Sequence, residues 1–282
     1  MTNAPDFDSV FVTQYKTVSR MVLQMASEGK KYYYITSLEK GLKVLELLSE
    51  RGAMRVGQIA ASLGYNRAGA HRFVSTLKDL GYVQQTAEGL YELTFKILEH
   101  STKLASRFEI RKSASVFMRQ LSATFNETIN LGFLDQSDVV HIDKIESQEI
   151  LRPDPEIGSR APAHKTALGK AILAFLPSDK LAAFLEQAEW TPGPPNACPD
   201  PDALMSQIYT IREKGYSMDD EELCLGLRCV AVPIFDNLNY PRYSISISGP
   251  SMRMSYERME QMSHELIRVG RSLSERLQQA GQ

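Results

Sequence analysis

Residues 66–80 have the sequence NRAGAHRFVSTLKDL, and this segment predicts the fold of the first part of the chain. It begins with Asn66, a residue type favoured at helix N-caps, and Gly81 follows it as a helix stop. Between them the apolar residues repeat at the spacing of one helical face: Ala70, Phe73, Val74 and Leu77. We therefore predict a helix that packs this face on a core. The polar residues that project away from that core are Arg67, His71, Arg72, Ser75 and Lys78.

Two further helical segments precede this helix. In the first, Thr36 and Glu39 have the spacing of a capping box, and the segment ends near Gly52. Its apolar residues are expected to share one face: Leu38, Leu42, Leu45 and Leu48. The second helix, over residues 56–63, lasts only two turns, and Gly64 is placed to adopt the left-handed conformation of a helix C-terminus. The three short helices are expected to share one small core.

Two short strand-like segments follow, at residues 82–85 and 90–93, and the turn between them contains Gly89. Three helices followed by a hairpin are typical of a winged helix-turn-helix domain. The donors near the start of the third helix suit contacts with base edges and phosphates: Asn66, Arg67, His71 and Arg72. Ser75 and Lys78 continue the same exposed face toward DNA, and the wing can add Gln84 and Gln85. The solvated face of an ordinary amphipathic helix would carry a similar stripe. The agreement of turn, short second helix and hairpin favours DNA binding.

The rest of the chain has a different pattern. Residues 94–108 and 110–125 are expected to be helical, and further helices are predicted at residues 166–175, 179–188, 201–214 and 255–279. Strands are predicted at residues 128–134, 139–145, 228–235 and 243–248. This is the pattern of an α+β domain with an antiparallel sheet. The predicted division is an N-terminal arm (1–30), a winged helix-turn-helix domain (31–94), a linker helix (95–109) and a second domain (110–282).

The N-terminal arm has one helical signal, because Val18, Met21, Val22 and Met25 have the spacing of a short amphipathic helix. Such an arm either stabilises a dimer or reaches DNA, or it is a loosely docked extension.

The composition is that of an ordinary globular protein with 43% hydrophobic and 23% charged residues in 282. No run approaches the roughly 18 apolar residues that span a bilayer, and Asp6 and Asp8 lie where a secretory signal is positively charged, so a cytoplasmic protein is expected. Three Cys without a C-x-x-C pair predict neither a disulfide framework nor structural zinc.

Charge is divided unevenly along the chain. Residues 31–95 carry 8 basic and 6 acidic side chains, whereas residues 96–282 carry 21 basic and 25 acidic side chains. The basic balance is therefore local to the predicted DNA-binding domain.

Longer motifs resemble those of the IclR family of bacterial transcriptional regulators. In the first part they are ITSLEKGLKVLELL (35–48), AHRFVSTLKDLGYV (70–83) and LYELT (90–94). In the second part they are ETINLG (127–132), IGSRAPAHKTALGKAILA (157–174), DDEE (219–222), GLRCVAVPIFD (226–236) and SISGP (246–250). The resemblance therefore extends from residue 35 to the C-terminal helix.

The resemblance implies a regulator, more often a repressor, that binds double-stranded operator DNA as a dimer or a dimer of dimers. Its second domain would be an effector-binding domain related to GAF-type small-molecule sensors. The positions that match effector contacts of the family are Gly158, Ser159, Ala161, Asp219, Cys229, Ser246 and Ser248. One position departs from the pattern, because Ala68 and Gly69 replace a Ser-Thr pair that is frequent in the family. DNA contacts are then expected to shift to neighbouring side chains or to the bare backbone.

Residues 243–248 alternate strictly, which places Ser244, Ser246 and Ser248 on one face of a strand. Hydroxyls on a rigid strand suit a small carboxylate or polyoxygenated ligand, although alternation alone describes a solvent-exposed sheet face as well. The family resemblance favours the pocket. The backbone amides of residues 157–164 and the following helix N-terminus are expected to help hold a carboxylate. Lys165, where many relatives have a small residue, would either pair with an acidic effector or extend into solvent. Residues 235–248 look most like members that govern sugar-acid catabolism, and aromatic acids are the alternative.

Two other functional classes compete with this interpretation. A thiol enzyme would use Cys224 or Cys229 with His141 or His164 and an Asp, but Cys229 lies in an apolar strand, and no nucleophile elbow or phosphate loop is present. We therefore expect no catalytic residue, no cofactor and no metal site. In the third class the helical module of a ligand sensor binds protein instead of DNA, and the salt dependence of binding to duplex DNA distinguishes the two.

Overall fold

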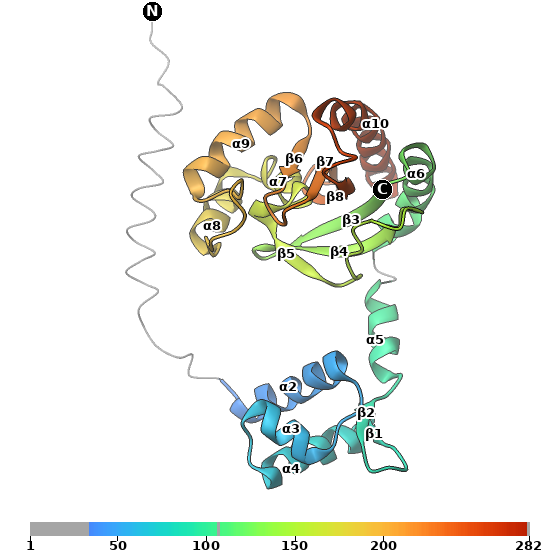
Figure 1. Cartoon of the computed structure of the whole chain (residues 1–282), viewed down its shortest axis with the longest axis vertical. Coiled ribbons are helices and arrows are strands. Elements are labelled where there is room, and N and C mark those ends of the chain that lie inside the picture. Colours follow the sequence, from blue (N-terminus) through green and yellow to red (C-terminus); the bar gives the residue numbers. More distant parts are fainter. Residues whose placement is uncertain (1–33, 106–107, 281–282) are drawn as a thin grey trace, which may run out of the picture. The chain divides into compact units, whose positions relative to one another are not determined.

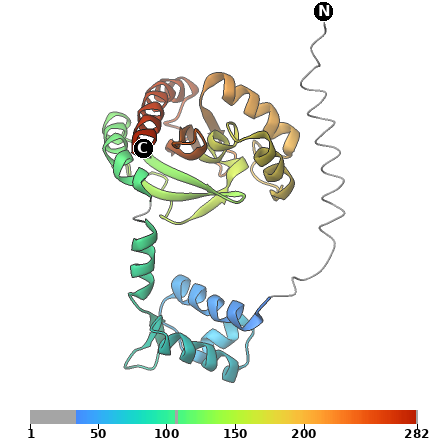
Figure 2. The same cartoon turned by 180° about the vertical axis from the view of Figure 1, so that it is seen from behind.

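The computed structural model describes residues 34–105 and 108–280. These residues form two compact units with the boundary between Phe108 and Glu109 (Figure 1, Figure 2). The predicted arm and its helix lie outside the described residues. Within the described ranges, none of the helices is long and apolar enough to cross a membrane.

The N-terminal unit is a winged helix-turn-helix, as predicted. Its elements are α2 Thr36–Arg51, α3 Val56–Leu63, α4 Arg67–Asp79, β1 Val83–Gln85 and β2 Tyr91–Leu93, and the two strands pair antiparallel. The turn between α3 and α4 has the predicted chemistry, because Gly64 is left-handed with φ 67° and the backbone N–H of Gly69 donates to Asn66 Oδ1 at 2.6 Å. Each of the five elements contributes to the core, whose buried residues are Val44, Leu47, Leu48, Met54, Ile59, Val74, Leu77, Val83 and Tyr91.

The start of α2 differs from the prediction. The N-cap residue is Ile35, its side chain makes no capping hydrogen bond, and Glu39 instead accepts a hydrogen bond from Lys43 Nζ at 2.6 Å. The capping box was therefore wrong. The predicted apolar face was also wrong in part, because Leu38 and Leu42 are 59% and 49% exposed. The segment has apolar residues on two faces, and the face that packs on α3 and α4 is that of Val44, Leu47 and Leu48.

The helix α5, Lys96–Ala105, follows the hairpin and begins two residues later than predicted. Thr94 precedes it and accepts a hydrogen bond from the backbone N–H of Lys96 on Oγ1, at 3.3 Å. Its apolar residues Leu98 and Leu104, and Phe95 just before it, are more than half exposed.

The C-terminal unit confirms the α+β prediction. Its helices are α6 Glu109–Phe125, α7 Ala167–Leu173, α8 Ser178–Gln187, α9 Pro201–Lys214 and α10 Tyr256–Ala280, with a short 3-10 helix η1 at Ala163–Lys165. Its strands are β3 Thr128–Asp135, β4 Asp138–Ile145, β5 Arg160–Pro162, β6 Ser217–Asp220, β7 Leu227–Phe235 and β8 Pro241–Pro250. They form one antiparallel sheet in the order β5-β4-β3-β8-β7-β6.

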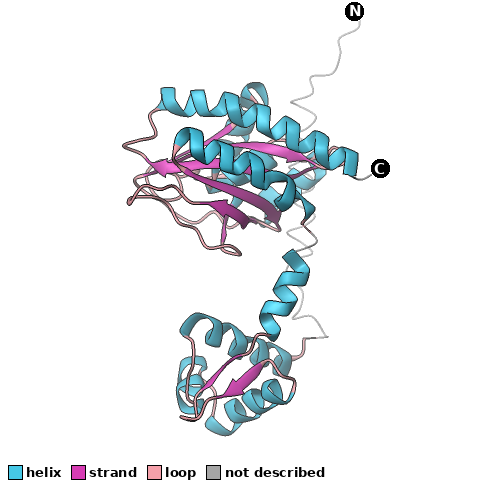
Figure 3. Ribbon diagram, turned by 90° about the vertical axis from the view of Figure 1, so that its right-hand side faces the viewer, coloured by secondary structure: helices cyan, strands magenta, loops and turns pink. Residues whose placement is uncertain are grey.

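Helices cover both faces of this sheet (Figure 3). On one face α10 packs so closely on β7 that a Cβ at Gly270 would lie 2.9 Å from Val232 Cγ2. On the other face α7 packs over β3 and β8, because Leu168 lies beside Gly132 and Ser244. Since side chains alternate along β8, Ser246 and Ser248 point to the α7 face. Both faces of β8 are buried at these positions, which excludes the solvent-exposed sheet face.

Three short elements were not predicted: β5, η1 and β6. The first two together span only residues 160–165, and Pro162 in the edge strand β5 hides the strand signal. The second edge strand, β6, has the sequence SMDD, whose two acidic residues are unfavourable in strands by propensity alone.

Candidate functional site

The polar face of α4 is open to solvent. Of the eight residues predicted to contact DNA, Ser75 is half-buried and the other seven are exposed: Asn66, Arg67, His71, Arg72, Lys78, Gln84 and Gln85. Asn66 Oδ1 accepts the capping hydrogen bond of α4, and the amide nitrogen of the same side chain remains a donor for a ligand. Gln84 Nε2 donates to Glu92 Oε1 at 2.8 Å, within the wing.

A cleft of about 580 Å³ brings α3, α4 and the wing together. Its walls carry Arg67 and His71 from α4 and Gln85 from β1, three residues that are separate in the sequence pattern. Arg55, at the N-cap of α3, completes this polar group. Two guanidinium groups, an imidazole and an amide on one open surface are donors suited to phosphate oxygens.

Arg55 was missed by sequence reasoning, although its place before the second helix was a usable signal, because a helix N-terminus beside a basic residue favours anions. Arg72 lies on the other side of α4, where it lines a groove shared with α2. The structure therefore divides the predicted basic stripe between two surfaces of the same helix.

The C-terminal unit encloses a cavity of about 280 Å³ on the α7 face of the sheet. Residues from β3, β4, β6, β7, β8, α7 and two loops line it: Asn130, His141, Pro153, Asp154, Pro155, Thr166, Ala167, Leu168, Asp219, Leu223, Leu227, Cys229, Ser246 and Ser248. Strand register explains this gathering, because Asn130 lies opposite Ser246, Ser248 opposite Cys229, and Cys229 opposite Asp219.

Hydrogen bonds fix part of this wall and leave part of it unused. Asn130 Nδ2 donates to Ser248 Oγ at 3.1 Å and lies 3.5 Å from Ser246 Oγ. The backbone N–H groups of Glu222 and Leu223 donate to Asp219 Oδ1 at 2.8 and 3.4 Å. Asn130 Oδ1 and Asp219 Oδ2 are buried and have no protein partner. Two unpartnered oxygen atoms in one cavity are acceptors available to a ligand.

Burial dominates the electrostatics of the cavity. It raises the pKa of Asp219 to about 6, partly offset by Lys170. It also lowers the pKa of His141, which therefore stays neutral near pH 7. The pKa of the Cys229 thiol is raised far above its ordinary value by burial, so this thiol is not an activated nucleophile.

The predicted effector residues fall into two groups. Asp219, Cys229, Ser246 and Ser248 line the cavity, and the other four lie outside its lining. Of these four, Gly158 donates its backbone N–H to His141 O at 2.7 Å, and His141 N–H donates to Ser159 O at 3.0 Å, so both support a lining residue.

Ala161 is buried in β5 opposite Val139, and Lys165 is buried beside the loop after α8. Lys165 Nζ donates to the backbone oxygen and Oγ1 of Thr191, at 2.7 and 3.0 Å. Lys165 therefore neither extends into solvent nor enters the cavity.

The residues that sequence reasoning missed come from other segments. They include Asn130 and His141, together with the loop of residues 153–155, whereas Thr166 and Leu168 lie at the start of α7, the helix whose N-terminus was expected to help hold a carboxylate. Asn130 lies in the motif ETINLG, where it is a polar residue within a predicted apolar strand. A polar side chain in a buried strand needs a partner, and this feature could have identified Asn130 as a cavity residue. Within the described ranges, no group of three His, Cys, Asp or Glu residues is arranged to hold a metal ion.

Two family models match the chain. Residues 37–87 match the model described as IclR helix-turn-helix domain, and residues 102–275 match the model described as Bacterial transcriptional regulator IclR C-terminal. The chain is 33% identical to the HTH-type transcriptional regulator KdgR of Dickeya chrysanthemi over 271 residues, which cover 95% of this chain and 89% of KdgR. It is 31% identical to the transcriptional repressor IclR of Escherichia coli, with 85% and 89% of the two chains covered.

The crystal structure of the Thermotoga maritima IclR superimposes with a TM-score of 0.75 and 30% identity, covering 87% of this chain and all of that one. These matches concern transcriptional regulators, and they confirm the expectation that the chain is not an enzyme. The N-terminal unit is a DNA-binding module and the C-terminal unit an effector-binding domain. The chain belongs to the IclR family of bacterial transcriptional regulators.

Proposed function

We propose that this regulator is a repressor that binds a pseudopalindromic operator as a dimer or a pair of dimers and changes its DNA affinity when a small hydroxylated acid occupies the cavity of the C-terminal unit. The name of the Escherichia coli relative, a transcriptional repressor, supports repression. As a bacterial DNA-binding regulator, the protein would act in the cytoplasm, where the operator is.

The observation that carries the ligand proposal is the pair of buried acceptors Asn130 Oδ1 and Asp219 Oδ2. A buried oxygen without a partner costs free energy, about 1 to 3 kcal/mol in mutational series, and a ligand that donates hydrogen bonds removes this cost. Hydroxyl groups at neighbouring carbons are such donors. The hydroxyls of Ser246 and Ser248 can donate or accept, so they fit the remaining oxygen atoms of the ligand.

The cavity lining also favours a sugar acid over an aromatic acid. Among its described residues none is Phe, Tyr or Trp, so the only aromatic ring that these residues offer a ligand is the imidazole of His141. None is Lys or Arg either, and a carboxylate must be held by neutral donors. With a pKa of about 6, Asp219 is mostly ionised near pH 7, where it accepts a hydrogen bond from a ligand hydroxyl; only its protonated form, below that pH, donates to a carboxylate.

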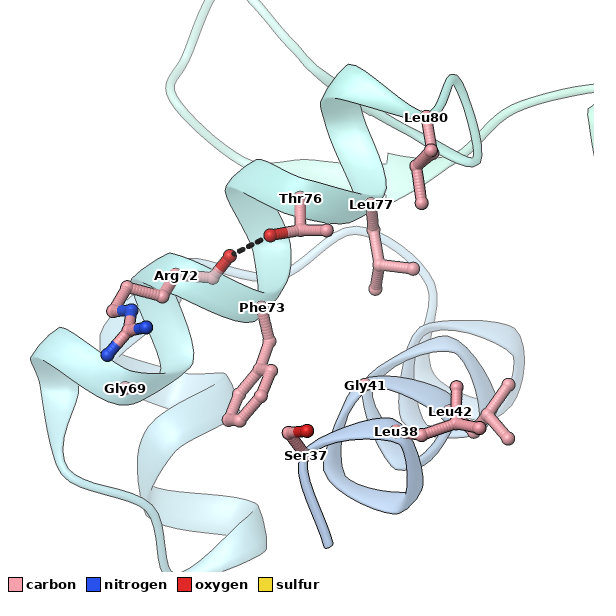
Figure 4. A pocket seen from close by; sticks show the side chains of 10 residues that line it. All are labelled: Ser37, Leu38, Gly41, Leu42, Gly69, Arg72, Phe73, Thr76, Leu77 and Leu80. Atoms are coloured by element: carbon pink, nitrogen blue, oxygen red, sulfur yellow. Dashed lines mark hydrogen bonds between the residues drawn. The ribbon is translucent and has the colours of Figure 1, made fainter. Parts of the chain in front are cut away.

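Self-association is supported by an apolar groove between α2 and α4, of about 500 Å³. Figure 4 shows Phe73, Leu77 and Leu80 on α4 and the turn after it, with Leu38 and Leu42 on the neighbouring α2. Three of these leucines, Leu38, Leu42 and Leu80, are about half exposed or more. An exposed apolar surface of this kind marks an interaction site, and two half-sites of an operator require two copies of the helix α4.

A thermal-shift screen of sugar acids, keto acids and aromatic acids on the purified protein tests the ligand class. We expect stabilisation by a sugar acid, loss of this response in D219N, and a change in operator affinity at the same ligand concentration. Stabilisation by aromatic acids alone would contradict the proposed class.

Measuring the affinity for random duplex DNA at two salt concentrations tests the N-terminal unit, since phosphate contacts predict that this affinity falls steeply as the salt concentration rises. Absence of DNA binding at both concentrations would favour a protein-binding module.

A further inference from the structure

A buried lysine lies behind the wall of the cavity. Lys170 of α7 is 1% exposed, and its ammonium group donates to Gln207 Oε1 of α9 at 2.9 Å. It also forms an ion pair with Glu222, which is 5% exposed. Removing two charges from water is unfavourable unless both are paired and hydrogen-bonded. Neither residue lines the cavity, so the pair has no direct part in ligand contact.

The pair connects two walls of the same cavity. Glu222 belongs to the turn that carries Asp219, and its backbone N–H donates to Asp219 Oδ1. Glu221, between them, has a φ of 59°, a conformation that is unfavourable for a residue with a side chain. On the other side, Lys170 lies on α7 one turn after Ala167 and Leu168, which line the cavity. The ion pair therefore ties the Asp219 turn to α7.

The two charges also act on Asp219 in opposite directions. Lys170 lowers the pKa of Asp219 and Glu222 raises it, whereas burial has the largest effect and raises it. The other titratable groups around Asp219 are Cys229, opposite it on β7, and His141 and Asp154, which line the same cavity. With both charges of the pair present, their effects on the pKa of Asp219 oppose each other, and that of Lys170 is the larger.

We propose that Lys170 and Glu222 are positioning residues for the effector cavity: their ion pair holds the turn at residues 219–223 so that the free oxygen of Asp219 faces the cavity, and it balances the charge beside that oxygen. This inference rests on the proposed function in taking the cavity as the effector site. The pair would thereby fix both the direction and the protonation of the group that contacts the ligand.

The charge balance is tested in the ligand-free, full-length protein by ¹³C NMR titration of the Asp carboxyl groups, with D219N identifying the Asp219 resonance. K170M leaves Glu222 unpaired, so the titration midpoint of Asp219 should rise. E222Q leaves Lys170 unpaired, so the midpoint should fall. Each change should be about one pH unit, as expected for a unit charge several ångströms away in a medium of intermediate dielectric constant. D179N, at an exposed position of α8, is the matched control and should leave the midpoint unchanged.

Opposite shifts separate a charge balance from a merely structural role. If both variants moved the midpoint toward that of a solvated Asp, the cavity would only have opened to water, and the proposal would be wrong. It would also be wrong if neither variant moved it. Should K170M fail to fold, K170Q keeps hydrogen-bonding atoms for Glu222 and Gln207 and should shift the midpoint in the same direction as K170M.

The tether is tested in the double variant K170M/E222Q, which removes both charges and should move the Asp219 midpoint less than K170M alone does. Without the tether, amide hydrogen exchange of Glu222 and Leu223 should accelerate at least tenfold, whereas that of Val230 in the sheet stays unchanged. Unchanged exchange in the turn would contradict the positioning role. If the variants show the expected shifts and faster exchange but the wild-type protein binds no acid, the proposed function is contradicted and this inference stands.

Discussion

The two units hold their functional groups in opposite ways. In the N-terminal unit the groups proposed to meet DNA are exposed on a helix whose apolar face already completes a core. In the C-terminal unit the groups proposed to meet the effector are buried: Asp219 and Ser246 are 1% exposed and Asn130 is 2% exposed. An exposed cation keeps its hydration, whereas a buried polar atom loses it and needs a partner. We therefore expect substitutions in the two units to differ in kind as well as in size.

The largest effect is expected at a glycine of the C-terminal unit. At Gly169 a Cβ would lie 2.2 Å from the backbone oxygen of Ala163 and 2.4 Å from its Cα, so the backbone of η1 or α7 must move. G169A should reduce the free energy of unfolding of this unit by about 3 kcal/mol or more, the range of severe steric changes in cores. Urea denaturation followed by tryptophan fluorescence measures this loss, because Trp190, the single Trp, lies in this unit. A variant as stable as the wild type would show that this close packing does not constrain the unit.

The next effect concerns acid stability and comes from His164. This residue is 1% exposed, its ring lies 4.6 Å from that of Trp190 between centroids, and neither ring nitrogen has a protein partner. Burial lowers its pKa from 6.5 to about 4. Because the folded state resists protonation, stability is full above pH 6.5 and falls as the pH decreases toward 4, by about 3 kcal/mol for this group.

The variant H164F lacks the titrating group and should lose this dependence. Urea denaturation at pH 7.5 and pH 4.5 should show a smaller drop for H164F than for the wild type. Asp219 contributes with the opposite sign, because its folded pKa of about 6 is above its ordinary value and its stabilising effect is lost as the pH rises from about 4 to 6. This contribution is present in both proteins and cancels in the comparison. Equal pH dependence in the two proteins would mean that His164 titrates in the folded state with its ordinary pKa.

The contrast between the units also explains what could be predicted from the sequence. Local signals specify the N-terminal unit: Asn66 caps the helix that starts beside it, and Gly64 ends the one before it. Those interactions span three or four residues, so the sequence displays them directly. The exposure of Leu38 and Leu42 could not be predicted, because α2 has apolar residues on two faces and only tertiary packing selects one.

The cavity depends on contacts between distant segments. Asn130 reaches Ser248 across 118 positions of sequence, and only the strand register brings them together. The family motifs pointed to Asp219, Cys229, Ser246 and Ser248, which line the cavity. The same motifs did not indicate where the side chain of Lys165 lies. Its ammonium group is held by Thr191, in a proline-rich loop whose position has no periodic signal in the sequence.

A third prediction tests whether the two sites are separate. R72A should weaken operator binding about tenfold through the loss of one charged contact and leave effector affinity unchanged. S246A should weaken effector binding to a similar extent and leave the DNA affinity of the ligand-free protein unchanged. Fluorescence anisotropy with labelled operator DNA and a thermal-shift titration measure the two affinities. K180A, which removes an exposed lysine of α8, is the control. A variant that weakens both affinities equally would contradict the two-site arrangement.

The smallest effect is expected at the glycine of α4. A Cβ at Gly69 would lie 3.0 Å from Asn66 Oδ1, the far end of an exposed side chain that can move by a few tenths of an ångström. Ala is favoured over Gly in a helix by about 1 kcal/mol, and the weakened cap removes part of this gain, so G69A should stabilise the N-terminal unit by less than about 1 kcal/mol.

DNA affinity should change less than twofold in G69A, because the added methyl group carries no charge and removes none of the donor side chains proposed to contact DNA. Chemical denaturation followed by circular dichroism and operator titrations measure the two quantities. A loss of DNA affinity above tenfold with unchanged stability would mean that the bare backbone at residue 69 touches the DNA. The interface would then include the backbone of α4 between the cleft and Arg72, and the absence of hydroxyls at residues 68 and 69 would be a means of close approach.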